Sequence, residues 1–134
     1  MKFGFNFGSS SSGISVSNNL VVNGNFSDGV TGWTSMQETD GVGSTLDGQG
    51  WQAFTTEVDK IYNFYSRCDR AGVSPSISVK QNTENGTSLL VMHPADTGWN
   101  TYAGQFTATS TVSVVHFGNG SNTALFDDVS VKEA

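Results

Sequence analysis

Residues 61–68 decide the fold and read Ile-Tyr-Asn-Phe-Tyr-Ser-Arg-Cys. Successive side chains of an extended strand point to opposite faces of a sheet, so this stretch separates into two sets. We expect the first set to point toward a core: Tyr62, Phe64, Ser66 and Cys68. The second set then faces away from that core: Asn63, Tyr65 and Arg67. The stretch therefore predicts a strand buried on one face only, and it predicts that Cys68 is an inert core thiol.

Short strands of the same kind are expected along most of the chain. They cover residues 14–16, 20–22, 51–58, 77–81, 87–92, 102–109, 111–117 and 125–131. Asn85-Gly86 lies between two of them and is a strong hairpin signal, because both residues tolerate a positive φ. Residues 41–50 contain four glycines and are expected to form a loop, and Asp59-Lys60 is expected to form a turn. Eight or nine short strands predict an all-β domain, namely a two-sheet antiparallel β-sandwich of the jelly-roll type.

The composition agrees with an all-β domain and excludes several partners. Gly, Ser, Thr and Asn make up 59 of the 134 residues, and all four are poor helix formers. Three Trp, nine Phe and three Tyr need a core in which to be buried. The net charge is −6 and the six basic residues are scattered, so no nucleic-acid partner is expected. A single cysteine excludes an internal disulfide, and no apolar run is long enough to predict membrane insertion.

Four segments, taken in order, are similar to one known family. Residues 19–33 read Asn-Leu-Val-Val-Asn-Gly-Asn-Phe-Ser-Asp-Gly-Val-Thr-Gly-Trp, and residues 125–131 read Leu-Phe-Asp-Asp-Val-Ser-Val. Between them lie Lys-Ile-Tyr-Asn-Phe-Tyr at 60–65 and Trp-Asn-Thr-Tyr-Ala-Gly-Gln-Phe-Thr at 99–107. Together they resemble the non-catalytic carbohydrate-binding modules, of the xylan- and glucan-binding type, that occur on xylanases and glucanases. The resemblance extends over about residues 18–132 and implies a galactose-binding-like jelly roll, and we expect this domain to comprise residues 14–134.

The resemblance also implies that one outer sheet face holds a glycan chain. Sugar C–H surfaces stack on aromatic rings, and polar side chains form hydrogen bonds with the hydroxyl groups. Strand parity selects the side chains that point outward. The predicted carbohydrate-binding residues are Trp51, Asn63, Tyr65, Arg67, Lys80, Trp99 and His116. For Trp51 and Trp99 the alternative is packing in the core, and for Tyr65 it is simple β-propensity on a solvated face.

A structural calcium ion is the one cofactor that the resemblance implies, at the place where the first and last strands meet. Asn25, Asp28 and Asp127 are its predicted ligands, since calcium prefers hard oxygen atoms. The chain departs from the family pattern here, because Ser27 occupies the position of the family's acid and Asp28 follows one residue later. The alternative is that Asp127 only caps backbone amides of a turn near Phe26.

Residues 1–13 are interpreted as an extended N-terminal arm with a serine-rich tether. Phe3, Phe5 and Phe7 alternate with small or polar residues and precede the run at 9–12, which is all serine. Exposed phenylalanines at this density indicate a surface that contacts a partner. We therefore expect the arm to dock on a larger protein assembly, in which the protein occurs as a homo-oligomer or in many copies. The alternative is a disordered terminus or a cloning remnant.

No catalytic motif is found in the sequence. Its two histidines, His93 and His116, lie in no metal or nucleophile motif, and no spacing selects a pair of carboxylates. We therefore expect a non-catalytic binding protein on a virion or an extracellular surface, anchored by its arm and presenting a glycan-binding module. Bacteriophage particles are one setting for such proteins, and the sequence shows no secretion signal. The alternative is a module excised from a secreted polysaccharide-degrading enzyme.

Overall fold

The computed structural model describes residues 18–119 and 121–134, and these residues form nine strands and no helix. Strand 14–16 and the side chains of Phe3, Phe5 and Phe7 lie outside the described residues. The strands are β1 (Met36–Thr39), β2 (Val42–Thr45), β3 (Gln49–Thr55), β4 (Ile61–Asp69), β5 (Ser76–Gln81), β6 (Ser88–Met92), β7 (Trp99–Thr107), β8 (Val112–Gly118) and β9 (Leu125–Glu133).

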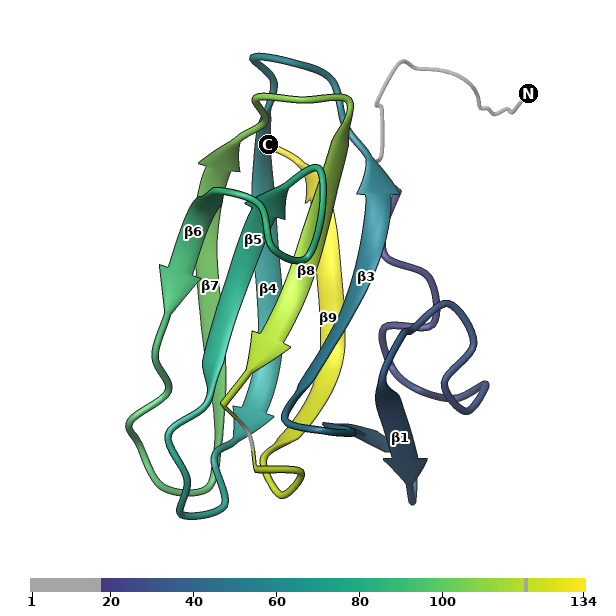
Figure 1. The fold of residues 1–134 in the computed structure, drawn as a ribbon, viewed down its shortest axis with the longest axis vertical. Helices are drawn as coiled ribbons and strands as arrows, with labels where there is room; N and C mark the ends of the chain where they lie inside the picture. Colours follow the sequence, from purple (N-terminus) through teal and green to yellow (C-terminus); the bar gives the residue numbers. More distant parts are fainter. Residues whose placement is uncertain (1–17, 120) are drawn as a thin grey trace, which may run out of the picture.

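The strands form two antiparallel sheets, which confirms the predicted β-sandwich. The five-stranded sheet has the order β1-β2-β9-β4-β7, and the four-stranded sheet has the order β3-β8-β5-β6. In Figure 1 the four-stranded sheet lies in front of β7, β4 and β9. Strands that follow one another in the chain often belong to different sheets, and this is how residues far apart in sequence come to share one outer face.

The alternation in β4 is confirmed. Its four inward side chains are buried, while Asn63 and Tyr65 are exposed and Arg67 is half-buried. β4 is an interior strand of its sheet, because it pairs with β7 on one side and β9 on the other. Burial raises the pKa of the Cys68 thiol to about 12, so this group stays protonated at neutral pH.

Aromatic side chains join the two sheets through the core. Phe117 of β8 stacks on Phe126 of β9 with ring centroids 4.0 Å apart. Trp33, from the segment before β1, stacks on Phe117 at 5.6 Å and on Phe26 at 5.2 Å. Each large apolar side chain buried in this way contributes about 1.5–3 kcal/mol to folding. This stack fixes the distance and the registration of the two sheets.

The region before β3 differs from expectation. Residues 41–50 were expected to form a loop, but they contain β2 and the first residues of β3. Two of their glycines serve close packing instead of turning: a Cβ on Gly43 would lie 2.3 Å from the Phe26 ring, and one on Gly50 would lie 2.2 Å from Met36 Sδ. Residues 20–22 are not a strand either, although Leu20 N donates to Val131 O at 2.8 Å.

The two expected turns are confirmed. Lys60 N donates to Glu57 O, and Asp59 adopts a φ of 70° between β3 and β4. The hairpin around Asn85-Gly86 connects β5 to β6, and Gln81 N donates to Thr87 O at its base. The reason given for it is wrong, because Asn82 has the positive φ, 67°, and neither Asn85 nor Gly86 has one.

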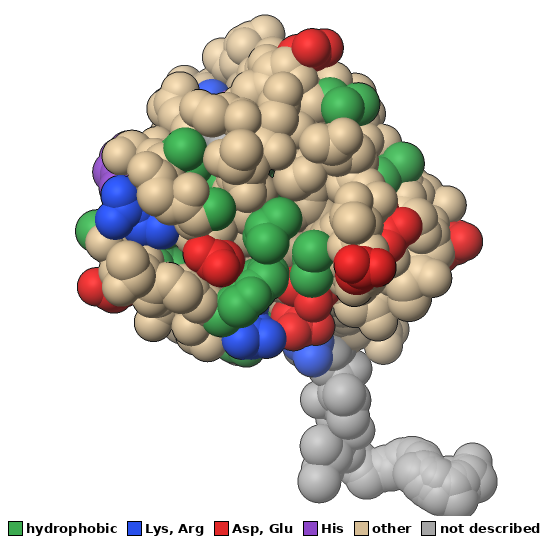
Figure 2. Space-filling view, turned by 90° about the horizontal axis from the view of Figure 1, so that it is seen from below, with side chains coloured by type: hydrophobic (Ala, Val, Ile, Leu, Met, Phe, Trp, Pro, Cys, Tyr) green, Lys and Arg blue, Asp and Glu red, His purple; other side chains and the backbone are tan. Residues whose placement is uncertain are grey.

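Two observations concern possible partners of the surface, namely membranes and nucleic acids. None of the described residues belongs to a helix that is long and apolar enough to cross a membrane. Seen from below, Lys and Arg side chains occur in separate places with acidic side chains among them (Figure 2).

Candidate functional site

The candidate site lies on the outer face of the four-stranded sheet. Ile77, Val79, Val115 and Phe117 point into the core, so the alternate residues of β5 and β8 point outward. Strand register places these outward residues in rows across the sheet. The central row is formed by Val91, Ser78, His116 and Trp51. One neighbouring row is formed by Ser88, Lys80, Val114 and Ala53, and the other by Ser76, Gly118 and Gln49.

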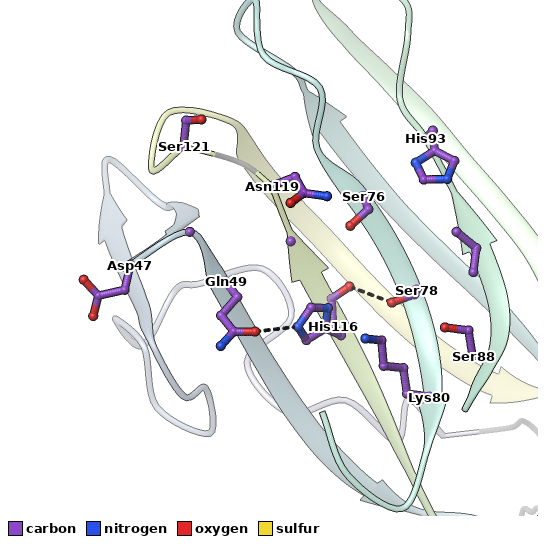
Figure 3. A pocket seen from close by; sticks show the side chains of 13 residues that line it. Asp47, Gln49, Ser76, Ser78, Lys80, Ser88, His93, His116, Asn119 and Ser121 are labelled. Carbon is purple, nitrogen blue, oxygen red and sulfur yellow. Dashed lines mark hydrogen bonds between the residues drawn. The ribbon is translucent and has the colours of Figure 1, made fainter. Parts of the chain in front are cut away.

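Most of these outward residues line the floor of an open pocket of about 540 Å³, whereas Trp51, Ala53 and Val114 are not part of its lining. Polar side chains dominate its lining and converge on the centre from β3, β5, β6 and β8 (Figure 3). They include Gln49, Ser76, Ser78, Lys80, Ser88 and His116. The loop residues Asp47, His93, Asn119 and Ser121 border it. A pocket with several hydroxyl and amide groups over a rigid sheet is suited to a ligand that carries many hydroxyls.

His116 is the most constrained polar group of the pocket. It is 8% exposed, and its Nε2 lies 3.0 Å from Gln49 Oε1. Burial, followed by the charge of Lys80, lowers the pKa of His116, so the ring is neutral at pH 7. Because an amide oxygen only accepts, Nε2 carries the hydrogen and Nδ1 is left as an acceptor. Nδ1 is buried and has no hydrogen-bond partner among the described residues. An unsatisfied buried acceptor of this kind is costly unless a ligand or water satisfies it.

Gly118 keeps the space beside this acceptor open. A Cβ built on Gly118 would lie 3.0 Å from Ser76 Oγ, 3.2 Å from His116 Cε1 and 3.7 Å from His116 Nδ1. Any larger residue would therefore fill the space between the serine hydroxyl and the imidazole.

Trp51 stands next to the pocket on the edge strand β3. Its ring stacks on the His116 ring, with centroids 6.5 Å apart and an interplanar angle of 21°. The side chain is half-buried on the outer face and does not belong to the core cluster, so the alternative of core packing is wrong. Its position makes it an apolar wall beside a polar floor.

The seven predicted carbohydrate-binding residues do not share one face, and this part of the prediction is wrong. Trp51, Lys80 and His116 lie on the outer face of the four-stranded sheet. The other four lie on the outer face of the five-stranded sheet: Asn63, Tyr65, Arg67 and Trp99. Strand parity tells which side chains avoid the core, but it does not tell which sheet a strand joins. The core of the sandwich separates the two sets.

On the five-stranded face the polar groups bond to one another. Arg67 lies over the Trp99 ring at 5.1 Å and forms an ion pair with Asp128 at 3.9 Å. An extra residue in β9 creates a bulge opposite Tyr65 and Arg67, and Asp128 has a φ of 51° there. Gln105 Nε2 donates to Asn63 Oδ1 at 2.9 Å.

Sequence reasoning missed several residues of the pocket. Gln49, Ser76 and Gly118 belong to its floor, and none was among the predicted site residues. Ser76 and Gly118 could have been found by extending the alternation of their strands by one step. Gln49 was hidden because the glycines around it indicated a loop.

The predicted calcium ligands do not line one common pocket. Asn25 and Asp28 line a second pocket of about 610 Å³ together with Asp128, and Asp127 is not part of that lining. Asn25 Oδ1 accepts from Ser27 N at 3.1 Å, and Asp127 Oδ1 accepts from Asp128 N at 2.8 Å. Asp127 thus accepts from the backbone amide of Asp128, and not from a turn near Phe26 as the alternative interpretation expected. Among the described residues no group of three or more His, Cys, Asp or Glu is placed to hold a metal, and calcium binding stays a prediction.

Comparison with known proteins identifies the fold. No protein-family model and no curated protein matches the chain. A solved CBM4 carbohydrate-binding module aligns with a TM-score of 0.68 and 17% identity, covering 85% of this chain and 99% of the module. TmCBM61, solved in complex with β-1,4-galactotriose, aligns with a TM-score of 0.64 and 14% identity, covering 87% and 99%. Tailspike protein 4 of bacteriophage CBA120 aligns with a TM-score of 0.64 and 14% identity, and the match covers 87% of this chain but 21% of the tailspike. The chain therefore has the jelly-roll fold of the carbohydrate-binding modules.

Proposed function

We propose that the protein is a non-catalytic module that binds glycans on the outer face of its four-stranded sheet. The observation that carries this proposal is the pocket itself, whose central buried acceptor, His116 Nδ1, has no partner among the described residues. A sugar hydroxyl is a donor of the right size for that acceptor. The likeness to carbohydrate-binding modules supports the proposal at the level of fold.

The surrounding side chains suit a sugar ring. Trp51 offers an apolar surface on which C–H groups stack, and its ring is held in place by His116. Gln49, Ser76 and Ser78 offer amide and hydroxyl groups at the floor. Rigid strands carry all of these groups, so little conformational entropy is lost when a ligand binds.

The same pocket argues against glycoside hydrolysis. That reaction requires two carboxylates on either side of the scissile bond. Asp47 is the one carboxylate among the described residues that line the pocket. A single acid on the border of the pocket supports binding without cleavage.

Titration calorimetry with a panel of neutral and acidic oligosaccharides tests the proposal, with two aromatic variants that differ in face. Trp51→Ala should weaken the binding of whichever sugar the wild type binds by about 2 kcal/mol, or roughly thirtyfold in Kd. Tyr65→Ala should leave Kd unchanged, because its ring lies on the opposite face. No binding of any sugar by the wild type would overturn the proposal, and a loss with Tyr65→Ala alone would move the site to the other face.

Attachment to a larger particle is a second candidate function. The arm with Phe3, Phe5 and Phe7 motivates it. A similar fold also forms part of a phage tailspike chain, at 14% identity. In this function the arm docks on the particle and the sandwich faces outward. Deletion of residues 2–8 should then release the protein from its assembly, as measured by co-sedimentation, while glycan binding is retained. Continued co-sedimentation of the truncated protein rules out anchoring by the arm.

A further inference from the structure

We propose that the pocket on the four-stranded sheet selects an acidic sugar, a uronic acid residue whose carboxylate is held by Lys80. The inference rests on the proposed function, because it names the sugar class for the same pocket. It begins with a side chain that glycan binding alone does not require.

Lys80 differs from most other basic side chains in having no partner. Its ammonium makes no hydrogen bond and no ion pair with any residue that the structure describes, and the side chain is half-buried in the pocket lining. By contrast, Lys60 lies 3.3 Å from both Glu57 and Glu133, and Arg67 pairs with Asp128. Arg70 donates to two backbone carbonyls, those of Val73 and Ala95. In a chain of net charge −6, an unpaired ammonium turned into a pocket is unusual.

Lys80 places one positive charge on its side of the pocket, where the Glu84 carboxylate acts on the pKa of His116 in the opposite direction. Lys80 lies one row from Ser78 and His116, and its ammonium points toward them over the sheet (Figure 3). Its charge contributes to keeping the His116 ring neutral. A ligand carboxylate next to the ammonium would be attracted to it and would form a charge-assisted hydrogen bond.

The two sides of the pocket differ in charge. Asp47 borders it on the side of β3, whereas Lys80 lies on β5 beside β6 (Figure 3). An anionic group is repelled at the first side and attracted at the second. A ring that donates a hydroxyl to His116 Nδ1 can therefore present its carboxylate to Lys80, with the Ser88 hydroxyl nearby as a further donor. One ammonium matches one negative charge, which favours a monoanionic carboxylate over a dianionic group.

Matched oligosaccharides test this inference. The probes are cellohexaose and its C6-carboxylated counterpart, together with β-1,4-linked galactose and xylose oligomers, oligogalacturonate, and a sulfated glucan oligomer. We expect the wild type to bind a carboxylated oligomer at least about tenfold more tightly than the neutral one at low salt, and to lose the preference as salt rises. Calorimetry on the full chain gives both affinities.

Two lysine variants make the test specific. Lys80→Gln should abolish the preference, so that this variant binds the carboxylated and the neutral oligomer with equal affinity. Lys132→Gln is the matched control, because this exposed lysine lies on β9 in the other sheet, opposite Asn63. It should bind like the wild type, and so exclude an effect of net charge alone.

The outcomes separate the inference from the proposed function. Equal or tighter binding of the neutral oligomers by the wild type overturns the acidic-sugar inference and leaves a glycan-binding module in place. A preference for the sulfated oligomer over the carboxylated one also overturns it. A preference that survives in Lys80→Gln shows that another group reads the charge and rejects the role of Lys80. Binding of none of the probes counts against both.

Discussion

The two outer faces of this sandwich carry similar polar and aromatic side chains. They differ in whether the polar side chains form hydrogen bonds and ion pairs with their neighbours. On the five-stranded face, Arg67 is engaged by Trp99 and Asp128, and the amides of Asn63 and Gln105 bond to each other. This face also carries the more exposed aromatic rings, with Tyr65 37% and Trp99 36% exposed.

The four-stranded face is less aromatic. His116 Nε2 bonds to Gln49 Oε1 there, but two of its polar groups have no such neighbour. The Lys80 ammonium has no partner among the described residues, and His116 Nδ1 is buried without one. The contrast teaches that aromatic exposure alone is a poor guide to a sugar site. Polar groups that a rigid sheet holds apart from one another remain available for a ligand, whereas groups that already bond to a neighbour stabilise the surface.

The largest expected effect is a loss of folding stability from a change in the core, which supports both outer faces. Phe126→Ala takes away the ring that stacks on Phe117 between the sheets, and a truncation of this kind costs about 3–5 kcal/mol. Urea unfolding followed by tryptophan fluorescence measures this loss. Tyr65→Ala on the five-stranded face is the control and should cost less than about 1 kcal/mol. A similar cost for both variants would mean that the Phe117–Phe126 stack does not hold the sheets together.

A smaller change should affect one face only. Gly118→Ala places a methyl group beside His116 Nδ1, and we expect glycan affinity to fall about tenfold, as when one hydrogen bond to a ligand is lost. Thermal unfolding should change little, because the nearest atom, Ser76 Oγ at 3.0 Å, ends a short side chain that can rotate. Unchanged affinity in a folded variant would show that no ligand group reaches Nδ1.

The pH dependence of stability should also report the four-stranded face. The folded-state pKa of His116 is lowered by burial and by Lys80, so below the unfolded value near 6.5 the unfolded chain takes up the proton first. The free energy of unfolding should therefore fall as the pH is lowered through that value. In His116→Gln this part of the slope should disappear, as judged by urea unfolding between pH 7.5 and about pH 5. An identical slope in the variant would contradict a neutral, buried imidazole.

At lower pH, Asp127 on the five-stranded face should change the free energy of unfolding with pH in the direction opposite to that of His116. Burial of Asp127 raises its pKa above the usual value of 3.8. The folded chain then binds the proton more readily than the unfolded chain. The contribution of Asp127 to the free energy of unfolding is therefore lost as the pH rises through its folded-state pKa. Asp127→Asn should flatten that part of the profile.

The smallest expected effect comes from the five-stranded face, where the polar side chains already bond to one another. Arg67→Ala removes a cation–π contact and an ion pair whose partners are both partly exposed to solvent, so we expect a loss of under about 1 kcal/mol in the free energy of unfolding. Glycan affinity should not change. Calorimetry at low and at high salt measures the affinity, and a loss of affinity here would indicate a site on the five-stranded face.

Local pattern predicted the architecture and the inward or outward direction of the side chains. The alternation at 61–68 was enough to place Tyr65 and Arg67 outside and Phe64 inside, because the period of a strand is two. Close packing was not visible in the sequence: Gly43 reads as a loop residue until the Phe26 ring is seen against it. The assignment of strands to sheets was also not visible, since it depends on long-range pairing such as that of β5 with β8.

Chemical-shift mapping of backbone amides during a titration with a bound oligosaccharide tests the location of the site directly. We expect the largest shifts at Gln49, Ser78, His116 and their neighbours on β3, β5 and β8, with little change at Asn63, Tyr65 and Ser130 on the opposite sheet. The reverse pattern, with the largest shifts on β4 and β9, would contradict a glycan site on the four-stranded sheet.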